Sequence, residues 1–244
     1  MKWLLIAATL LMAACAKRES TPIYFRVDPS SAATLNGQVI FTGKPTAAIV
    51  IDMDQDPECR KLYPDGKRED LAVLISPSGG LANPFVYVKS GLEGKAFEPP
   101  LATARIDQKG CWFVPRVSGI QVGQPFEVTN SDPVTHNIHP LAQVNREWNQ
   151  SQAPQDPPLK RRFIAQEVMI RIKCNVHKWM RSWIGVLPHP YFFTTGPDGR
   201  FTIPNLPPGN YTLVAWHETL GTRELSVTLA PGAQSQLEFK FTGQ

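Results

Sequence analysis

The sequence predicts an all-β protein built from sandwiches, and two observations lead to this prediction. The chain contains 23 Pro and 17 Gly, many of them in turns such as those at 64–66, 77–80, 197–199 and 207–209. Between these turns lie short runs rich in Val, Ile, Phe and Tyr, in which apolar and polar residues alternate. Closely spaced turns between short alternating runs are typical of β-sandwiches.

Each expected strand is one of these runs, and each ends at a turn residue or a polar cluster. The expected strands are 37–42, 47–52, 85–89, 104–107, 112–114, 119–122, 126–130, 137–139, 167–173, 184–187, 200–203, 209–218, 223–229 and 235–241. The best helix candidate is short and lies within 57–63. The segment 142–159 is rich in Asn, Gln and Pro, so we expect a long loop over a strand edge there.

The N-terminus has the layout of an export signal. One Lys is followed by an apolar run over 3–12 and then by small residues before Cys15, and the run is too short to span a bilayer. Residues 12–15, Met-Ala-Ala-Cys, resemble a bacterial lipobox, which implies a lipid on Cys15. We therefore expect removal of residues 1–14, a tether over 15–33 and a lipoprotein anchored to a membrane and facing the periplasm or cell exterior. An ordinary secreted protein cut nearby is the alternative.

The composition argues against several classes of function. The net charge is +4 and the one dense basic run is 160–162, which gives no case for nucleic-acid binding. No Ser/His/Asp set, paired carboxylates, phosphate-binding loop or dinucleotide fingerprint stands out. We therefore expect that the protein is not an enzyme, and we identify no small-molecule substrate.

Three cysteines remain after Cys15, which is an odd number for an exported protein. One of them must stay unpaired or bind something. The pairing that leaves Cys174 free joins Cys59 to Cys111; free buried thiols at both positions are the alternative.

A possible metal site begins in VMIRIKCNVHKWM, residues 168–180. Val168, Ile170, Ile172 and Cys174 fall on one strand face at period two, so the thiol points toward the core. A buried free Cys can be a small hydrophobic residue, and this alone decides nothing. The spacing Cys-x-x-His-x-x-Met, however, lets one short turn bring together the side chains of Cys174, His177 and Met180.

A second imidazole is available in NSDPVTHNIHP, residues 130–140. If this run is extended, His136 shares the core face with Ile138, whereas Asn137 and His139 share the opposite face. His136 is therefore the better ligand candidate, and His139 is the better candidate for a surface residue or for one that contacts a ligand.

Two imidazoles, one thiolate and a weak axial Met form the blue-copper ligand set, because soft sulfur ligands favour Cu(I) while imidazoles suit both oxidation states. A zinc site would more usually offer a harder fourth ligand or a second thiolate. A haem attached through Cys-x-x-Cys-His is excluded, since that motif does not occur in the chain.

Residues 130–140 and 168–180 resemble the cupredoxins, in particular amicyanin and plastocyanin, and the segments 119–128 and 183–186 occupy the places of that family's flanking strands. The resemblance implies a Greek-key sandwich over 84–190 and one type-1 copper held by His136, Cys174, His177 and Met180. It also implies that Asn137 hydrogen-bonds near the Cys loop and locks its geometry. Trp179 would shield the copper or form an apolar docking patch around an exposed edge of His177; packing against Trp183 is the alternative.

The stretches 35–52 and 198–221 resemble the two halves of the carboxypeptidase regulatory-like, transthyretin-like sandwich. We therefore expect 34–83 and 191–244 to form one sandwich, with the copper region 84–190 inserted between them. Three units in sequence, or one cupredoxin with decorated ends, are the alternatives.

Together these features predict a copper protein that shuttles single electrons to or from a redox protein partner. Copper storage, delivery or sensing is the second hypothesis, and a metal-free structural sandwich is the third.

Overall fold

The computed structural model describes residues 22–45, 47–54, 56–63, 65, 67–70 and 72–243. The expected signal segment, Cys15 and the first part of the expected tether lie outside these residues. Within the described part of the chain, the structure has no helix with the length and apolar character needed to cross a membrane.

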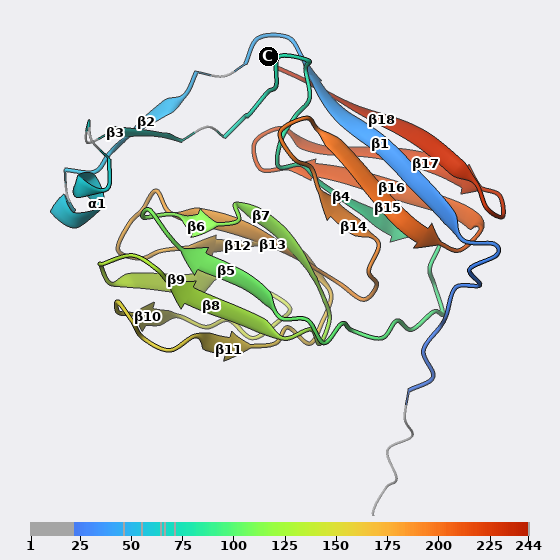
Figure 1. The fold of residues 1–244 in the computed structure, drawn as a ribbon, viewed down its shortest axis with the longest axis horizontal. Coiled ribbons are helices and arrows are strands. Elements are labelled where there is room, and N and C mark those ends of the chain that lie inside the picture. The colour runs from blue at the N-terminus through green and yellow to red at the C-terminus, as the bar shows by residue number, and fades with distance from the viewer. Residues whose placement is uncertain are drawn as a thin grey trace, which may run out of the picture.

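The described residues form two β-sandwiches and a small segment beside them (Figure 1). The terminal sandwich has one sheet of β15 (Arg200–Leu206), β1 (Ala33–Thr42) and β18 (Gln234–Thr242), and a second of β14 (Phe192–Thr194), β4 (Phe85–Ser90), β16 (Gly209–His217) and β17 (Gly221–Leu229). The inserted sandwich has one sheet of β10 (Gln150–Gln152), β9 (His136–Pro140), β12 (Glu167–Lys173), β13 (Arg181–Leu187) and β7 (Val117–Gln121), and a second of β11 (Leu159–Arg161), β8 (Phe126–Asn130), β5 (Ala104–Gln108) and β6 (Phe113–Val114). The remaining elements are β2 (Ile49–Asp52), α1 (Pro57–Lys61) and β3 (Lys67–Asp70), which we call the cover segment.

The two ends of the chain meet in the terminal sandwich. Strand β1 pairs in parallel with β18 and antiparallel with β15, so N-terminal and C-terminal segments share one sheet. The buried side chains of this sheet pack against those of β4 and β16 in one hydrophobic core. The predicted all-β class and the sandwich made from the terminal segments are both confirmed.

Strand β4 lies in a different sandwich from the one that the sequence predicted. The boundary at residue 84 placed it in the copper region, whereas it pairs with β14 and β16 of the terminal sandwich. The run Phe-Val-Tyr-Val that opens β4 is apolar on both faces, and each face packs in a different core, so its sequence indicates neither one buried face nor the partner strand. The inserted sandwich therefore begins near β5.

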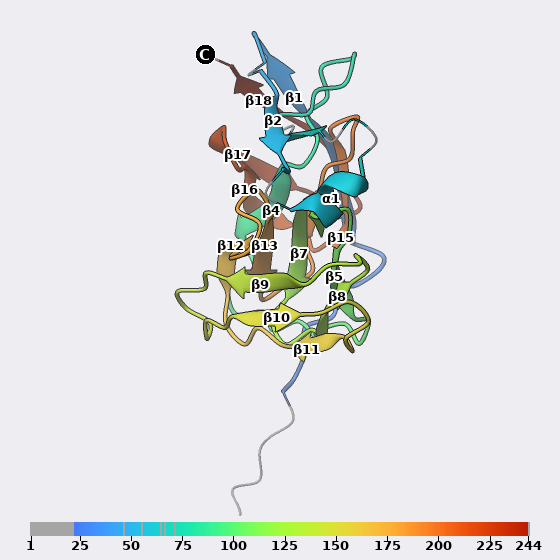
Figure 2. The same ribbon diagram turned by 90° about the vertical axis from the view of Figure 1, so that its left-hand side faces the viewer.

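The cover segment packs on a different sandwich from the one that the sequence predicted. Its residues were predicted to belong to the terminal sandwich, but Met53 and Cys59 are fully buried in the core of the inserted sandwich. Figure 2 shows α1 close to the inserted sandwich, in front of β7. The helix expected within 57–63 is confirmed, and Asp56 caps its N-terminus.

Strand β12 keeps the predicted alternation only in its second half. Ile170 and Ile172 are buried and Arg171 is exposed, but the pairing with β13 shifts register between Glu167 and Ile170. Met169, at φ 63°, lies within this irregularity. The expected loop at 142–159 contains the short strand β10 and reaches the start of β11.

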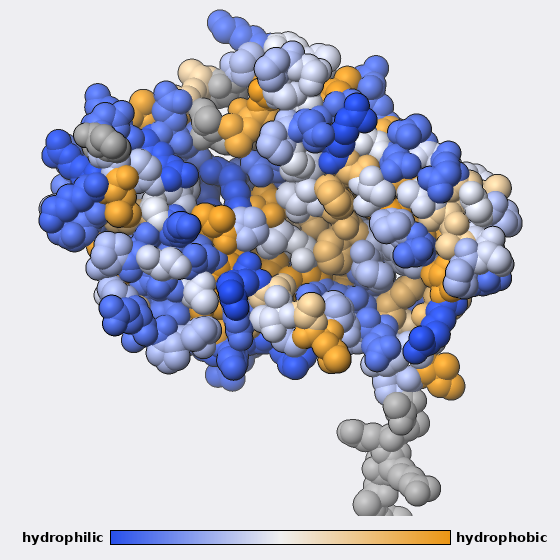
Figure 3. All heavy atoms as spheres, viewed as in Figure 1, coloured by the Kyte–Doolittle hydropathy of each residue, from blue (hydrophilic) through white to orange (hydrophobic). Residues whose placement is uncertain are grey.

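The two sandwiches pack together through a third, smaller core. Phe85 of β4 is fully buried there with Val117 and Leu187, and Trp183 packs against Trp216 with ring centroids 5.1 Å apart. Elsewhere, hydrophilic residues predominate on the face shown in Figure 3, and hydrophobic residues form small separate patches.

Gly185 makes room for the Phe85 ring in this interface. A Cβ atom on Gly185 would lie 2.5 Å from that ring, which is closer than van der Waals contact allows. We expect Gly185→Ala to destabilise the protein by about 1–3 kcal/mol, as other overpacked cores do, and urea denaturation would measure this. Gly196→Ala is the matched control, because its new Cβ would come no closer than 3.7 Å to any other side chain. Equal stability of the two variants would contradict the prediction.

Four charged side chains form a cluster of ion pairs beside the interface between the two sandwiches. Arg116 and Arg181 both contact the carboxylates of Asp70 and Glu218. Asp70 is the last residue of the cover segment and Glu218 follows β16, so the cluster links the cover segment and the inserted sandwich to the terminal sandwich.

Candidate metal centre

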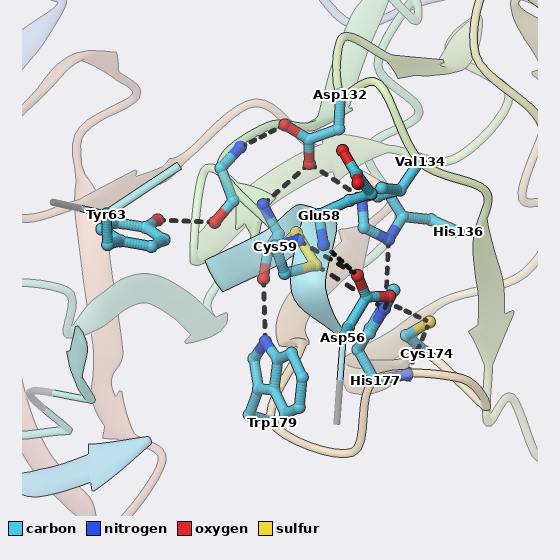
Figure 4. The surroundings of a disulfide bond; sticks show 12 residues. Asp56, Glu58, Cys59, Tyr63, Asp132, Val134, His136, Cys174, His177 and Trp179 are labelled. Atoms are coloured by element: carbon cyan, nitrogen blue, oxygen red, sulfur yellow. Dashed lines mark hydrogen bonds and ion pairs between the residues drawn. A yellow bond between two sulfur atoms is a disulfide. The ribbon is translucent and has the colours of Figure 1, made fainter. Parts of the chain in front are cut away.

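Three of the predicted ligands converge at one end of the inserted sandwich (Figure 4). His136 begins β9, and Cys174 and His177 lie in the loop between β12 and β13. The two Nδ1 atoms lie 2.9 Å apart, and Cys174 Sγ lies 3.8 Å from Nδ1 of His177. All three side chains are buried, and their potential ligand atoms lie within 4.8 Å of one another. One nitrogen of each imidazole therefore faces the thiol sulfur.

Backbone hydrogen bonds fold the loop around the sulfur of Cys174. The amide groups of Asn137 and His177 donate to Sγ at 3.4 and 3.3 Å. Within the loop, Met180 N donates to His177 O, and Cys174 N donates to Met180 O. These bonds hold Met180 at the base of the loop, where its side chain is fully buried in the same core as Cys174.

Asn137 ties the two ligand-bearing segments together. Its Oδ1 accepts a hydrogen bond from the amide of Asn175 at 3.2 Å, and its Nδ2 donates to Asn149 at 2.5 Å. The side chain thus connects the strand that carries His136 to the loop that carries Cys174, which is the position expected for a residue that locks the loop.

Each imidazole is held from behind by a carboxylate. Nε2 of His136 lies 2.7 Å from Oδ2 of Asp132, and Nε2 of His177 lies 2.7 Å from Oδ2 of Asp56. A carboxylate on the outer nitrogen fixes the tautomer and the ring orientation of a metal-binding histidine, and this pairing is common around metal sites. The outer nitrogens are engaged, so the inner Nδ1 atoms are the ones that can bind a metal.

The charges of the centre suit a thiolate. Burial alone would raise the pKa of Cys174, but hydrogen bonds from His136 and His177 and from backbone amides lower it to about 6. Burial lowers the pKa of His136, but Asp132 and Cys174 outweigh it, so that this pKa is raised overall. A thiolate at neutral pH is the form of cysteine that binds metal ions.

Both aspartates are held in the ionised form. Burial favours a higher pKa for Asp132, but hydrogen bonds from His136, Cys111 and Gly110 lower the pKa overall. For Asp56 the bond to His177 and the amides of α1 likewise overcome burial and lower the pKa.

The cysteines pair in the way that cysteine counting favoured. Cys59 of α1 forms a disulfide with Cys111, and Cys174 is the free, buried cysteine of the described residues. Two other groups of potential ligands, around Cys59 and around Cys111, overlap the centre. Their sulfurs are bonded to each other, so the group of His136, Cys174 and His177 is the one with a thiolate to offer.

His177 does not have the exposed edge that the docking-patch alternative for Trp179 requires. Its side chain is 2% exposed, because Asp56 and the disulfide of the cover segment lie against its outer nitrogen. Trp179 packs against the His177 ring with centroids 5.1 Å apart and donates a hydrogen bond to Cys111 O. Trp179 therefore covers the ring of His177, whereas Trp183 packs against Trp216 between the two sandwiches.

Sequence reasoning missed the roles of Asp56 and Asp132. Asp132 lies only four residues before His136, and this closeness in the sequence could have suggested that the two side chains pair. Asp56 lies 121 residues from His177 and gives only the signal of a helix N-cap. His139 is half-buried and away from the three converging side chains, in agreement with its predicted position outside the ligand set.

Residues 188–242 match the family model of the carboxypeptidase regulatory-like domain. This range contains β14 to β18, the C-terminal part of the terminal sandwich. No curated protein matches the sequence.

Several solved copper proteins resemble part of this chain. A copper-containing nitrite reductase from Thermus scotoductus SA-01 is 21% identical with a TM-score of 0.33, covering 40% of this chain and 24% of the reductase. A purple cupredoxin from Nitrosopumilus maritimus is 21% identical with a TM-score of 0.29, covering 34% of this chain and 98% of the cupredoxin. An oxidised amicyanin mutant is 17% identical with a TM-score of 0.32, covering 41% of this chain and 97% of the amicyanin. These scores are low, and the likeness carries no functional conclusion.

Proposed function

We propose that the protein binds one copper ion through Nδ1 of His136, Sγ of Cys174, Nδ1 of His177 and the thioether of Met180, and that it carries single electrons. The convergence of two Nδ1 atoms on one buried cysteine sulfur is the observation that supports this most directly. Copper, when bound, would supply the one-electron couple, and the protein would hold its ligands in place.

The donor set favours copper over a hard cation. The thiolate and the thioether are soft ligands, and imidazoles suit both Cu(I) and Cu(II). The nearby carboxylates of Asp56 and Asp132 are engaged with outer imidazole nitrogens rather than with the centre. A harder ion such as Mg²⁺ or Ca²⁺ prefers oxygen ligands, which the group of converging side chains lacks.

The rigidity of the centre favours an electron carrier over a delivery protein. His136, Cys174 and His177 are all buried, and hydrogen bonds fix the loop and both rings. A site that keeps its shape needs little rearrangement when an electron is gained or lost, whereas a delivery site must release its metal. We further propose that the protein is not an enzyme, that it is exported and lipid-anchored at Cys15, and that a redox protein is its partner.

The proposal predicts an intense visible thiolate-to-copper band when Cu(II) is added to the purified chain with Cys174 reduced. Cys174→Ser should abolish the band, because the hydroxyl is a hard and weakly acidic ligand. His136→Ala should weaken copper binding, and the band measured during a Cu(II) titration would show both effects.

His139→Ala is the matched control, since this neighbouring histidine lies outside the converging group. It should keep the band. A protein that gives no band with any preparation of reduced Cys174 would refute copper binding of this kind. Copper that binds but does not cycle reversibly in voltammetry would favour delivery or storage instead.

A further inference from the structure

The Cys59–Cys111 disulfide is linked to both imidazoles of the candidate centre through a repeated pattern of contacts. Each half-cystine donates its backbone N–H to an aspartate, and each of these aspartates contacts the outer nitrogen of one imidazole. Figure 4 shows the disulfide between the two aspartate side chains. The aspartates contact the outer nitrogens and not the sulfur of Cys174, so they can act on the centre only through the two imidazole rings.

On one side the cover segment supplies the aspartate. Oδ1 of Asp56 accepts the amides of Glu58 and Cys59, both at 3.0 Å, as the N-cap of α1. Its other oxygen is thereby aimed at Nε2 of His177, at 2.7 Å. The carboxylate cannot rotate away without losing the two hydrogen bonds that cap α1.

On the other side, the inserted sandwich supplies the second aspartate, Asp132, which contacts His136. Oδ1 of Asp132 accepts the amide of Gly110 at 2.6 Å, and Oδ2 accepts the amide of Cys111 at 2.7 Å. The same Oδ2 lies 2.7 Å from Nε2 of His136. The amides of Gly110 and Cys111 therefore fix the oxygen that faces the ring.

The disulfide ties the two sides together. It joins α1 to the inserted sandwich, and both of its cysteines are fully buried. One further bond, from the hydroxyl of Tyr63 to Gly110 O at 2.6 Å, connects the end of the same helix to the residue before Cys111. The cover segment is thus anchored where its aspartate meets His177.

We infer that Asp56 and Asp132 are positioning residues that hold Nδ1 of His177 and of His136 toward the metal, and that the Cys59–Cys111 disulfide keeps both in place. The inference rests on the proposed copper site. An anionic acceptor on the outer nitrogen raises the basicity of an imidazole, which stabilises bound Cu(II) more than bound Cu(I). Removing the negative charge should therefore weaken Cu(II) binding and raise the midpoint potential.

The test compares copper affinity and midpoint potential in the full chain and its variants. Asp56→Asn and Asp132→Asn, which keep an acceptor oxygen but lose the charge, should each lower Cu(II) affinity about 10- to 100-fold in a chelator competition. Each tenfold loss of Cu(II) relative to Cu(I) affinity should raise the midpoint potential by about 59 mV. Asp56→Ala should have a larger effect, and Asp56→Glu should recover part of it.

Asp107→Asn is the matched control. Asp107 accepts hydrogen bonds from Thr129 and Ser131 in the same sandwich and contacts neither imidazole. Its variant should keep the potential and affinity of the unmodified protein. The double variant Cys59→Ser/Cys111→Ser should shift both quantities in the same direction as Asp56→Asn; if it does not fold, the aspartate variants still decide.

The outcomes separate this inference from the proposed function. If the unmodified protein binds copper and the asparagine variants keep its potential and affinity, Asp56 and Asp132 do not position the rings, although the copper site stands. If the unmodified protein gives no thiolate-to-copper band, both proposals fall.

Discussion

Glu218→Ala is expected to lower the unfolding free energy by about 3–5 kcal/mol, which is the usual effect of removing one partner from a buried ion pair. Glu218 accepts hydrogen bonds from Arg116 and Arg181, and its side chain is only 4% exposed. Without it, two partly buried guanidinium groups would share Asp70 alone. Burial would raise the pKa of Glu218, but Arg116 and then Arg181 lower it, which indicates that the carboxylate is charged in the folded protein.

Urea denaturation followed by tryptophan fluorescence would measure this loss. Glu224→Ala is the matched control, because Glu224 pairs with Lys89 at 2.6 Å on the surface, where both side chains are about half exposed. Exposed pairs of this kind contribute about 0–1 kcal/mol. Similar losses in the two variants would show that the buried cluster does not join the sandwiches as described.

The second large effect concerns pH. Between pH 7 and pH 4 the unmodified protein should lose up to about 3 kcal/mol more stability than His189→Gln. Burial lowers the pKa of His189 to about 4, whereas the unfolded chain takes up a proton near pH 6.5. In that window the unfolded state binds the extra proton, so the stability contributed by neutral His189 is present above pH 6.5 and is lost as the pH falls toward 4.

The contacts of His189 explain why it stays neutral. Its Nε2 donates to Val88 O at 3.0 Å, and its Nδ1 accepts the amide of Tyr191 at 3.3 Å. A glutamine can keep the donor to Val88 but does not titrate. Unfolding free energies measured at several pH values would test the prediction, and parallel curves for the two proteins would contradict it.

The sequence was sufficient to predict the three converging side chains. Period-two alternation predicted an inward direction for Cys174, the spacing to His177 allowed a short loop, and Ile138 marked the buried face of His136. These signals are local, because they depend on neighbours within one strand or one turn. The disulfide was favoured by counting cysteines rather than by geometry.

The features that the sequence did not predict depend on contacts between segments that are distant in the chain. Strand β4 begins with four apolar residues that pack on both faces, and only pairing with β14 and β16 decides its sandwich. Asp56 reaches His177 because the disulfide anchors its helix. The residues next to Asp56 and next to His177 in the sequence do not indicate that contact. The burial of His177, which argues against the docking-patch alternative for Trp179, follows from the same long-range contact.

The parallel pairing of β1 with β18 has a consequence for the order of assembly. Strand β18 completes the sheet that β1 begins, so the terminal sandwich cannot close until residues near 242 have been made. Long-range pairing of this kind is slow to form. Most of the inserted sandwich is continuous in sequence, from β5 to β13, and we expect its strands to collapse first. Its packed core would then hold β4 and β14, which flank it in the sequence, near each other for the final strand pairing.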